Sequence, residues 1–234
     1  MRIAILASGK GSNLRVLLEQ AASGRLKAEP CLVLCNNPEA GAVEQARKYG
    51  VPCWCKNHQG MERGAFDAEM LEAMNKAGVQ GVVLAGYMRL LSASFIRAYQ
   101  GRIINVHPAL LPSFPGASGL RDALDYRVRL AGCTVHFVEE AMDSGAVIIQ
   151  AALPVLENDT TESLASRVHA LEHRILPQAT QWLAQGRLSR PNEAERPDQS
   201  GRAVRLAPPA PGSLAATPPP PPFPCLISPE LEEF

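Results

Sequence analysis

The alternation of apolar, strand-like runs with helix-like segments constrains the fold of this chain more than any other feature of its sequence. Residues 1–7 (MRIAILA) and 81–87 (GVVLAGY) are apolar almost throughout, whereas residues 65–78 (AFDAEMLEAMNKAG) form a helix-like segment that ends in glycine. Strands that are apolar on both sides must be covered on both sides, and intervening helices return the chain to start a parallel neighbour. The sequence therefore predicts an α/β fold, with a mostly parallel sheet between two layers of helices.

The later part of the chain departs from this simple alternation. Residues 133–138 (CTVHFV) and 146–155 (AVIIQAALPV) are separated only by EEAMDSG, which predicts a hairpin and a mixed sheet. Before this hairpin, residues 120–132 fit a helix, and after it a long helix is expected from about Thr160 to Gln185. The long helix begins with TTES, which resembles a capping box.

Proline content divides the chain into two parts. Residues 189–234 hold 12 of the 20 prolines and have no period of 2 or 3.6. Such a segment cannot bury enough apolar surface to offset its ordering entropy. We therefore expect one folded domain at residues 1–188 and a Pro-rich, disordered tail at 189–234, with polyproline II structure at Pro218–Pro222. That stretch suits a proline-recognising module, although a solvated tail without a partner is the simpler interpretation.

Charge and cysteine usage narrow the class of protein. The 234 residues carry no net charge at pH 7, which argues against nucleic acid or a membrane surface as the main partner. The N-terminal apolar run breaks at Ser8 and is too short for a signal peptide or a membrane span, so we expect a cytoplasmic protein. The cysteines lack the spacing of a zinc knuckle, so buried thiols are expected and no metal site.

Polar loops follow several predicted strands, at the edge where ligands bind in parallel sheets. The first loop is SGKGSN (8–13), whose glycines permit close approach to a ligand and whose Ser12 and Asn13 begin a helix. A dinucleotide fingerprint would need glycine at Leu14, and a P-loop would need Ser or Thr at Gly11. The loop therefore indicates either a site for a single phosphate or a simple glycine turn with an N-cap.

The loop NVHP (105–108) gives the sharpest indication of chemistry. Asn105 and His107 are two residues apart, so in an extended backbone they point to the same face. An amide and a titratable imidazole at one sheet edge suit oxyanion stabilisation and proton transfer, and the prolines that follow would hold them still. A histidine packed under a loop is the simpler alternative.

Two further loops have weaker signals. In GYMRLL (86–91), Tyr87, Met88, Leu90 and Leu91 could line a flat pocket, but ordinary core residues with an exposed Arg89 are the favoured interpretation. In MDSG, Asp143 has the composition of a turn, and it matters for chemistry only if it reaches His107. No serine or cysteine lies in a hydrolase motif, so direct transfer is expected rather than a covalent enzyme intermediate.

With these loops in this order, the sequence resembles the folate-dependent phosphoribosylglycinamide formyltransferases (glycinamide ribonucleotide transformylases). The resemblance covers about residues 1–188. It is carried by SGKGSN (8–13), VVLAGYMRLL (82–91), INVHPALLPSFPG (104–116), TVHFVEEAMDSG (134–145) and LEHRILP (171–177). It implies a Rossmann-like formyltransferase fold for a catalytic domain at 1–188. It also implies transfer of a formyl group from 10-formyltetrahydrofolate to the amine of glycinamide ribonucleotide in purine biosynthesis.

The resemblance also implies the roles of individual residues. Asn105, His107 and Asp143 match the catalytic trio, which would stabilise a tetrahedral oxyanion and move a proton to the leaving folate nitrogen. The residues that would bind substrate are Gly11, Ser12 and Asn13 at the phosphate and Glu172 at the ribose. Those that would bind folate are Arg63, Met88, Arg89, Leu90, Leu91 and Asn105. The implied partners are these two small molecules, without a metal, and the enzyme would be a monomer or a homodimer.

Some positions depart from the family pattern. Ser118 and Leu120 stand where the family often has histidines, and Ala109 replaces a common serine, so the loop around Ser118 is hard to predict. Another formyltransferase or a deformylase that uses 10-formyltetrahydrofolate is an alternative function. We expect such enzymes to add a basic C-terminal domain or an N-terminal regulatory domain. A non-catalytic module that binds phosphorylated metabolites is a third hypothesis, from a different class.

Overall fold

The computed structural model describes residues 1–189, 204–209 and 222–232 of the chain. The strands of its main sheet are β1 (Arg2–Ala7), β2 (Glu29–Cys35), β3 (Cys53–Cys55), β4 (Gly81–Leu84), β5 (Ile103–His107), β6 (Leu130–Phe137), β7 (Val147–Pro154) and β10 (Leu226–Ser228). The helices are α1 (Ser12–Ala22), α2 (Gly41–Lys48), α3 (Arg63–Lys76), α4 (Ala93–Ala98), α5 (Gly119–Asp125) and α6 (Thr161–Ala184). A separate two-stranded sheet joins β8 (Leu188–Ser189) to β9 (Arg205–Leu206).

The main sheet is mixed, with strand order β10-β7-β6-β5-β4-β1-β2-β3. Strands β1 to β5 are parallel, β6 and β7 form an antiparallel hairpin beside β5, and β10 pairs antiparallel with β7 at the edge. This arrangement confirms the predicted α/β class, the Rossmann-like parallel half and the mixed later half. It also places the carboxyl ends of β1, β4 and β5 at one edge of the sheet.

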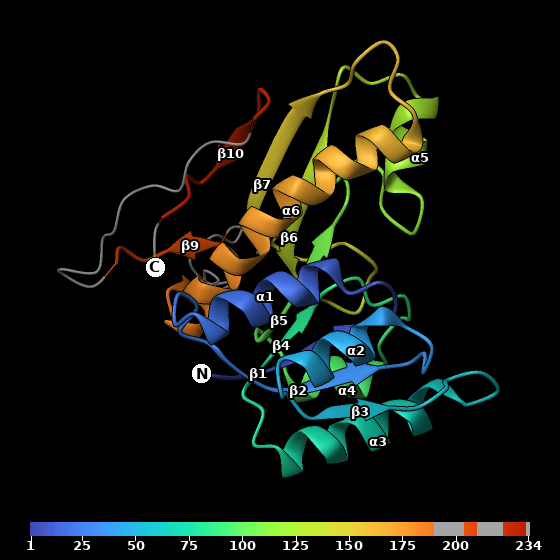
Figure 1. Ribbon diagram of the computed structural model, residues 1–234, viewed down its shortest axis with the longest axis vertical. Helices are drawn as coiled ribbons and strands as arrows, with labels where there is room; N and C mark the ends of the chain where they lie inside the picture. The colour runs from blue at the N-terminus through green and yellow to red at the C-terminus, as the bar shows by residue number, and fades with distance from the viewer. Residues whose placement is uncertain (190–203, 210–221, 233–234) are drawn as a thin grey trace, which may run out of the picture.

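Two hydrophobic cores lie on the opposite faces of the sheet, because successive residues of a strand point to opposite sides. In β1, Ile3 and Ile5 belong to the core beneath α1, α2 and α6, whereas Ala4 and Leu6 belong to the core beneath α3 and α4. Figure 1 shows α1 and α6 side by side over the first of these faces. The continuous apolar runs of the sequence are therefore strands that are covered on both sides.

The long helix α6 agrees with the prediction, whereas the helix before the hairpin is shorter than predicted. Helix α6 begins as predicted, with a capping box in which Thr160 and Ser163 each accept a bond from the other's backbone N–H. The helix predicted at 120–132 is wrong in its second half, because α5 ends at Asp125 and β6 begins at Leu130. Arg127, between them, adopts a left-handed backbone with φ 59°, which a helix cannot continue through.

Two described parts of the predicted tail form strands, which differs from the expectation of a disordered segment. Strand β10 pairs antiparallel with β7, and β9 pairs with β8. Glu232 binds back to the end of α6, where its carboxylate accepts from Trp182 and from the Arg187 guanidinium. Figure 1 shows β10 as a red strand beside β7. Residues 218–221 of the predicted polyproline stretch lie outside the described residues.

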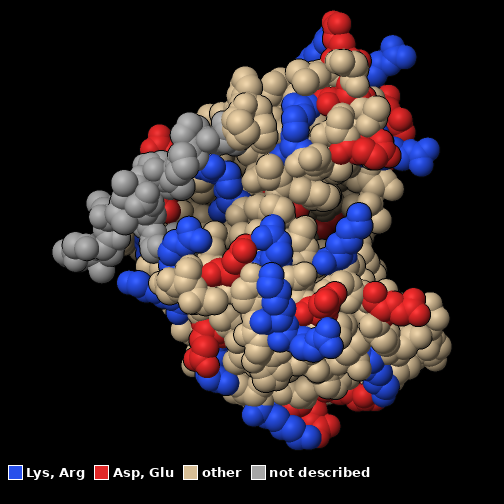
Figure 2. Space-filling model, in the orientation of Figure 1, with Lys and Arg blue, Asp and Glu red and all other residues tan. Residues whose placement is uncertain are grey.

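Other features bear on the expectations from composition. Among the described residues, no helix combines the length and the apolar character that crossing a membrane requires. Cys31, Cys35 and Cys133 are buried free thiols in strands, as expected, whereas Cys53 is exposed on β3. Figure 2 shows positive and negative side chains interspersed on the visible face, in keeping with zero net charge.

Candidate active site

Backbone and side-chain bonds draw together the loops at the carboxyl ends of β1 and β4. The Ser8 backbone N–H donates to the Gly86 carbonyl at 3.1 Å, and the Met88 N–H donates to the Ser8 hydroxyl at 2.8 Å. Strand β5 pairs with β4 so that Asn105 lies opposite Leu84. The loops that the sequence singled out therefore lie along one edge, and Figure 2 shows the molecule hollowed on one side, between the α5 end and the α2–β3 end.

The SGKGSN loop turns tightly into α1. Gly11 adopts φ 76°, and a Cβ there would lie 3.0 Å from the Ala42 Cα, so both conformation and space require glycine. Ser12 is the first residue of α1, and no side chain caps the helix start. The first turn contains no acidic residue. Its backbone N–H groups and the helix dipole therefore offer a favourable place for an anion.

Helix α6 contributes a buried carboxylate beside this loop. The Asn13 amide donates to Glu172 Oε2 at 2.8 Å, although the two residues are far apart in sequence. Glu172 is only 3% exposed, and burial raises the pKa of its carboxyl above the ordinary value. The structure thus joins two residues that the resemblance assigns to substrate, Asn13 and Glu172.

Asn105 and His107 lie on the same side of β5, as their spacing predicts. Strand β6 runs antiparallel beside them, with His136 opposite Asn105 and Thr134 opposite His107. His107 is 4% exposed, and Asn105 is half-buried. The Nε2–H of His107 donates to the Phe114 carbonyl at 2.8 Å, so the loop after β5 folds back over the imidazole ring.

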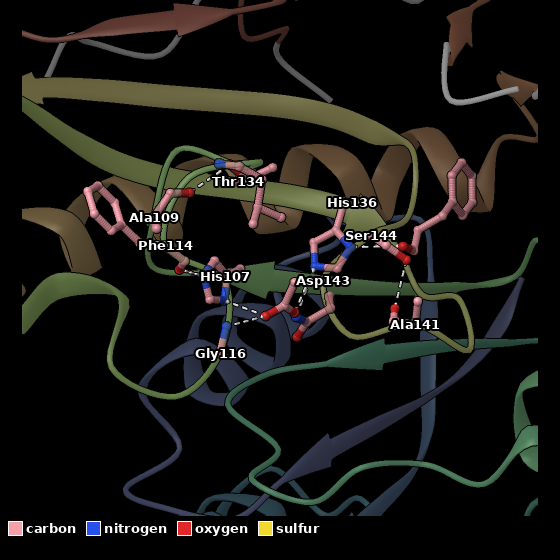
Figure 3. A network of polar contacts seen from close by, with 12 residues as sticks. His107, Ala109, Phe114, Gly116, Thr134, His136, Ala141, Asp143 and Ser144 are labelled. Atoms are coloured by element: carbon pink, nitrogen blue, oxygen red, sulfur yellow. Dashed lines mark hydrogen bonds and ion pairs between the residues drawn. The ribbon is translucent and has the colours of Figure 1, made fainter. Parts of the chain in front are cut away.

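Asp143 reaches both histidines from the turn between β6 and β7 (Figure 3). Its Oδ2 lies 3.5 Å from His107 Nδ1, and its Oδ1 lies 3.7 Å from His136 Nε2. The carboxylate also accepts the Gly116 backbone N–H at 2.8 Å. Asp143 has φ 51°, a left-handed conformation that aspartate and asparagine tolerate better than most residues. The structure therefore brings together the three residues of the proposed catalytic trio.

His136 is a further polar member of this site that the sequence analysis missed. Its Nδ1–H donates to the Phe137 carbonyl at 2.8 Å, and its Nε2 accepts from the Asn105 amide at 3.1 Å. Burial lowers the pKa of His136, which favours the neutral ring that these bonds need. The alternation of CTVHFV places His136 on the same face as Thr134, but only the pairing of β6 with β5 reveals its partner.

The residues predicted to bind folate are placed differently from one another. Met88 is 73% exposed and Leu90 is 52% exposed, whereas Leu91 is in the core beneath α3 and α4. The Arg89 guanidinium stacks 4.7 Å from the Phe66 ring and donates to the His58 carbonyl at 3.3 Å, so it is held by the protein. Arg63 is exposed at the start of α3.

The groups at this edge suit acyl transfer between an anionic substrate and a second, flatter molecule. An amide and an imidazole offer N–H donors to a developing oxyanion, and the carboxylate of Asp143 stabilises positive charge nearby. In the part of the chain that the structure describes, no three His, Cys, Asp or Glu side chains are grouped to hold a metal ion.

Known proteins are similar to this chain in both sequence and fold. Residues 1–180 match the family model described as formyl transferase. The phosphoribosylglycinamide formyltransferase of Bacillus subtilis (strain 168) is 37% identical over 183 residues, which cover 78% of this chain and 94% of that protein. The crystal structure of glycinamide ribonucleotide transformylase 1 from Symbiobacterium toebii superimposes with a TM-score of 0.82. It is 42% identical and covers 88% of this chain and 94% of that one.

One relative contains a region similar to this chain within a longer protein. The trifunctional purine biosynthetic protein adenosine-3 of Drosophila pseudoobscura pseudoobscura is 42% identical over 199 residues, which cover 83% of this chain. The chain spans only 14% of the length of that relative. The match to the family model covers most of the chain and includes Asn13, Asn105, His107, His136, Asp143 and Glu172. This chain therefore belongs to the formyl transferase family.

Proposed function

We propose that this chain transfers the formyl group of 10-formyltetrahydrofolate to the amine of glycinamide ribonucleotide, a step of purine biosynthesis. The names and the high coverage of its relatives support this activity. The observation that carries the proposal is the convergence of Asn105, His107 and Asp143 beside a helix start suited to phosphate. A merely phosphate-binding module would not need that constellation.

The ribonucleotide would bind at the SGKGSN loop. Backbone N–H groups of Gly11, Ser12 and Asn13 would hold its phosphate at the start of α1, where the helix dipole favours negative charge. The Glu172 carboxyl, already bonded to Asn13, would accept a hydrogen bond from a ribose hydroxyl. This orientation would direct the substrate amine toward β5.

The folate would bind along the loop after β4. Met88 and Leu90 expose apolar surface for an aromatic ring system, and Leu91 supports that surface from the core. Arg89 is fixed on Phe66, and the exposed Arg63 would meet the negatively charged glutamate end of the cosubstrate. No part of this scheme calls for a metal ion, and 10-formyltetrahydrofolate acts as a cosubstrate.

The chemistry exchanges one carbon–nitrogen bond for another. The amine nitrogen attacks the formyl carbon, and the carbonyl oxygen becomes an oxyanion in a tetrahedral intermediate. The Asn105 N–H that does not bind His136 would donate to this oxyanion, and one such donor accelerates reactions about a hundredfold or more. The bond between the formyl carbon and the folate nitrogen then breaks. The amine loses one proton and the leaving folate nitrogen gains one, with the His107–Asp143 pair assisting the transfer.

A direct assay of formyl transfer tests the proposal. The full chain should convert glycinamide ribonucleotide and 10-formyltetrahydrofolate to the formylated ribonucleotide and tetrahydrofolate. Asp143→Asn keeps a residue that tolerates the left-handed backbone but removes the charge, so we expect kcat to fall about a hundredfold or more with little change in ribonucleotide binding.

The results separate this function from its alternatives. Binding of the ribonucleotide without turnover would favour a non-catalytic module. Release of formate from 10-formyltetrahydrofolate without formylation of the amine would favour a deformylase. Formylation of another amine acceptor, with none of the ribonucleotide, would indicate a different transferase of the family.

A further inference from the structure

The loop that follows β5 folds over the imidazole ring of His107 and encloses it. The Phe114 carbonyl takes the Nε2–H at 2.8 Å, while Asp143 faces Nδ1 at 3.5 Å (Figure 3). Both ring nitrogens therefore face acceptors that belong to the protein. The residue as a whole is only 4% exposed, so the ring is buried in this conformation.

Phe114 must adopt an unusual backbone conformation to present this carbonyl. Its φ is 54°, in the left-handed region that phenylalanine rarely occupies. Its ring makes an edge contact with Tyr126, with centroids 5.9 Å apart, although Tyr126 is 78% exposed. Strained backbone is often found at functional sites. Because the carbonyl of Phe114 bonds to a buried imidazole, its strained conformation is better explained by a role at that imidazole than by the needs of the turn.

Gly119 fills the remaining side of the ring. A Cβ at this position would lie 3.1 Å from the Phe114 oxygen and 3.3 Å from His107 Nε2, the two atoms of the hydrogen bond. It would also lie 3.2 Å from the Ala109 Cβ, so the site has little room to yield. The first residue of α5 is therefore small where the loop closes on His107.

We propose that Phe114 and Gly119 are positioning residues that hold the Nε2–H of His107 on the loop and leave only Nδ1, which faces Asp143, to exchange a proton. An imidazole between two acceptors is satisfied when both nitrogens carry hydrogen, which is the charged form. His107 then moves a proton only at Nδ1, the ring nitrogen that faces Asp143. The proton that the leaving folate nitrogen gains must then pass through the Asp143 side of the ring.

This inference rests on the proposed function for its kinetic consequences, but its structural part can be tested without substrate. Nitrogen-15 NMR of the full chain should find His107 with Nε2 protonated from acidic to alkaline pH. Gly119→Val places two methyl groups against the hydrogen bond, so we expect a mixture of ring tautomers. Gly119→Ala is the milder variant if the valine protein does not fold, and circular dichroism checks both.

The same variants give a kinetic readout. We expect Gly119→Val to lower kcat about tenfold while the KM values of both substrates stay within about twofold, since the variant disturbs the hydrogen bond between His107 and Phe114 at a distance from the binding contacts. The pH profile should shift as well. The titratable groups that act on His107 are Asp143, His136 and Glu172, and none of them is altered in the variant.

Ser118→Ala is the matched control. Ser118 is exposed, precedes Gly119 and makes no side-chain cap bond, so its substitution should leave the tautomer and kcat unchanged. An unchanged tautomer and pH profile in a folded Gly119→Val protein would overturn the inference. So would a wild-type His107 whose neutral form carries its proton on Nδ1. Absence of formyl transfer in the wild type would instead contradict the proposed function and leave the NMR result to decide this one.

Discussion

The imidazoles of His107 and His136 meet different partners and therefore suit different charge states. His107 lies between a carbonyl and a carboxylate, both of which accept hydrogen bonds. His136 donates at one nitrogen and accepts from Asn105 at the other, which only a neutral ring can do. The His136 ring fixes the Asn105 amide, and the His107 ring beside it is held between two acceptors.

Glu172 illustrates a conflict between stability and binding at a single residue. Burial raises the pKa of this carboxyl, so its charged form is costly in the folded protein at neutral pH. Glu172→Gln keeps an acceptor for Asn13 and removes that cost. We expect the free energy of unfolding at pH 7 to rise by about 1 kcal/mol and ribonucleotide binding to weaken about tenfold. Chemical denaturation and calorimetric titration measure the two effects.

A control separates the site from a general effect of charge. Glu157 is exposed on the loop before α6, and Glu157→Gln should change neither quantity. If Glu172→Gln lowers stability, the carboxylate is a structural anchor for α1 and α6, and its assignment to the ribose loses its main support.

Secondary-structure elements differ in how far the sequence could predict them. Long apolar runs with helices between them identified β1, β4 and α6, because burial on both faces leaves a clear pattern. Strand β10 was missed, because three residues among prolines have no pattern of their own and gain their structure from pairing with β7. The end of α5 was missed because one left-handed residue overrides a helix-like composition.

The candidate site follows the same division. Asn105 and His107 were predictable because they are two residues apart on one strand. His136 needed the register between β5 and β6, and the Asn13–Glu172 contact needed the packing of α1 against α6. Glu172 was reached through the family resemblance alone, and so was the assignment of Asp143 to the catalytic trio. Contacts between distant segments carry no local signal, so sequence periodicity could not supply them.

The contact between the C-terminal segment (222–232) and α6 makes a prediction at the level of this element. Glu232 accepts from Trp182 at 3.1 Å and from Arg187 at 2.9 Å, and Arg187 is buried. Glu232→Gln leaves the buried guanidinium without its counter-charge. We expect the free energy of unfolding to fall by about 1–3 kcal/mol and the melting temperature by several degrees. Thermal melts followed by tryptophan fluorescence measure this.

Glu230→Gln provides the comparison, since Glu230 is exposed in the same segment. Equal melting temperatures for the Glu230 and Glu232 variants would mean that the segment adds nothing to the fold. That result would restore the expectation of a tail separate from the domain.

The whole molecule should lose stability as the pH falls from neutral. Burial lowers the pKa of His136 and lowers that of His173 to about 4. The unfolded chain therefore binds more protons than the folded one between about pH 6.5 and pH 4, and the stability present above pH 6.5 is lost across that window. Glu172, whose pKa is raised, acts in the opposite direction. Thermal melts at a series of pH values should reveal the net decline.

His173 allows this explanation to be isolated, because it lies outside the proposed catalytic trio. His173→Leu cannot gain a proton, so its melting temperature should depend less on pH between 6.5 and 4 than that of the wild type. Its Nε2 has no hydrogen-bond partner among the described residues, so the substitution breaks no bond of that atom within them. Parallel curves for the two proteins would show that His173 does not drive the loss.

Strand β10 also has a consequence for the order in which the sheet is assembled during synthesis. Strands β5, β6 and β7 follow one another closely in the chain, and the residues of the site are complete once α6 has left the ribosome. The partner that closes the β7 edge is translated much later. In that interval the nascent protein has a formed site and an open sheet edge, which is a template for pairing with another chain. Chaperone contact during translation is therefore expected to concentrate on β7.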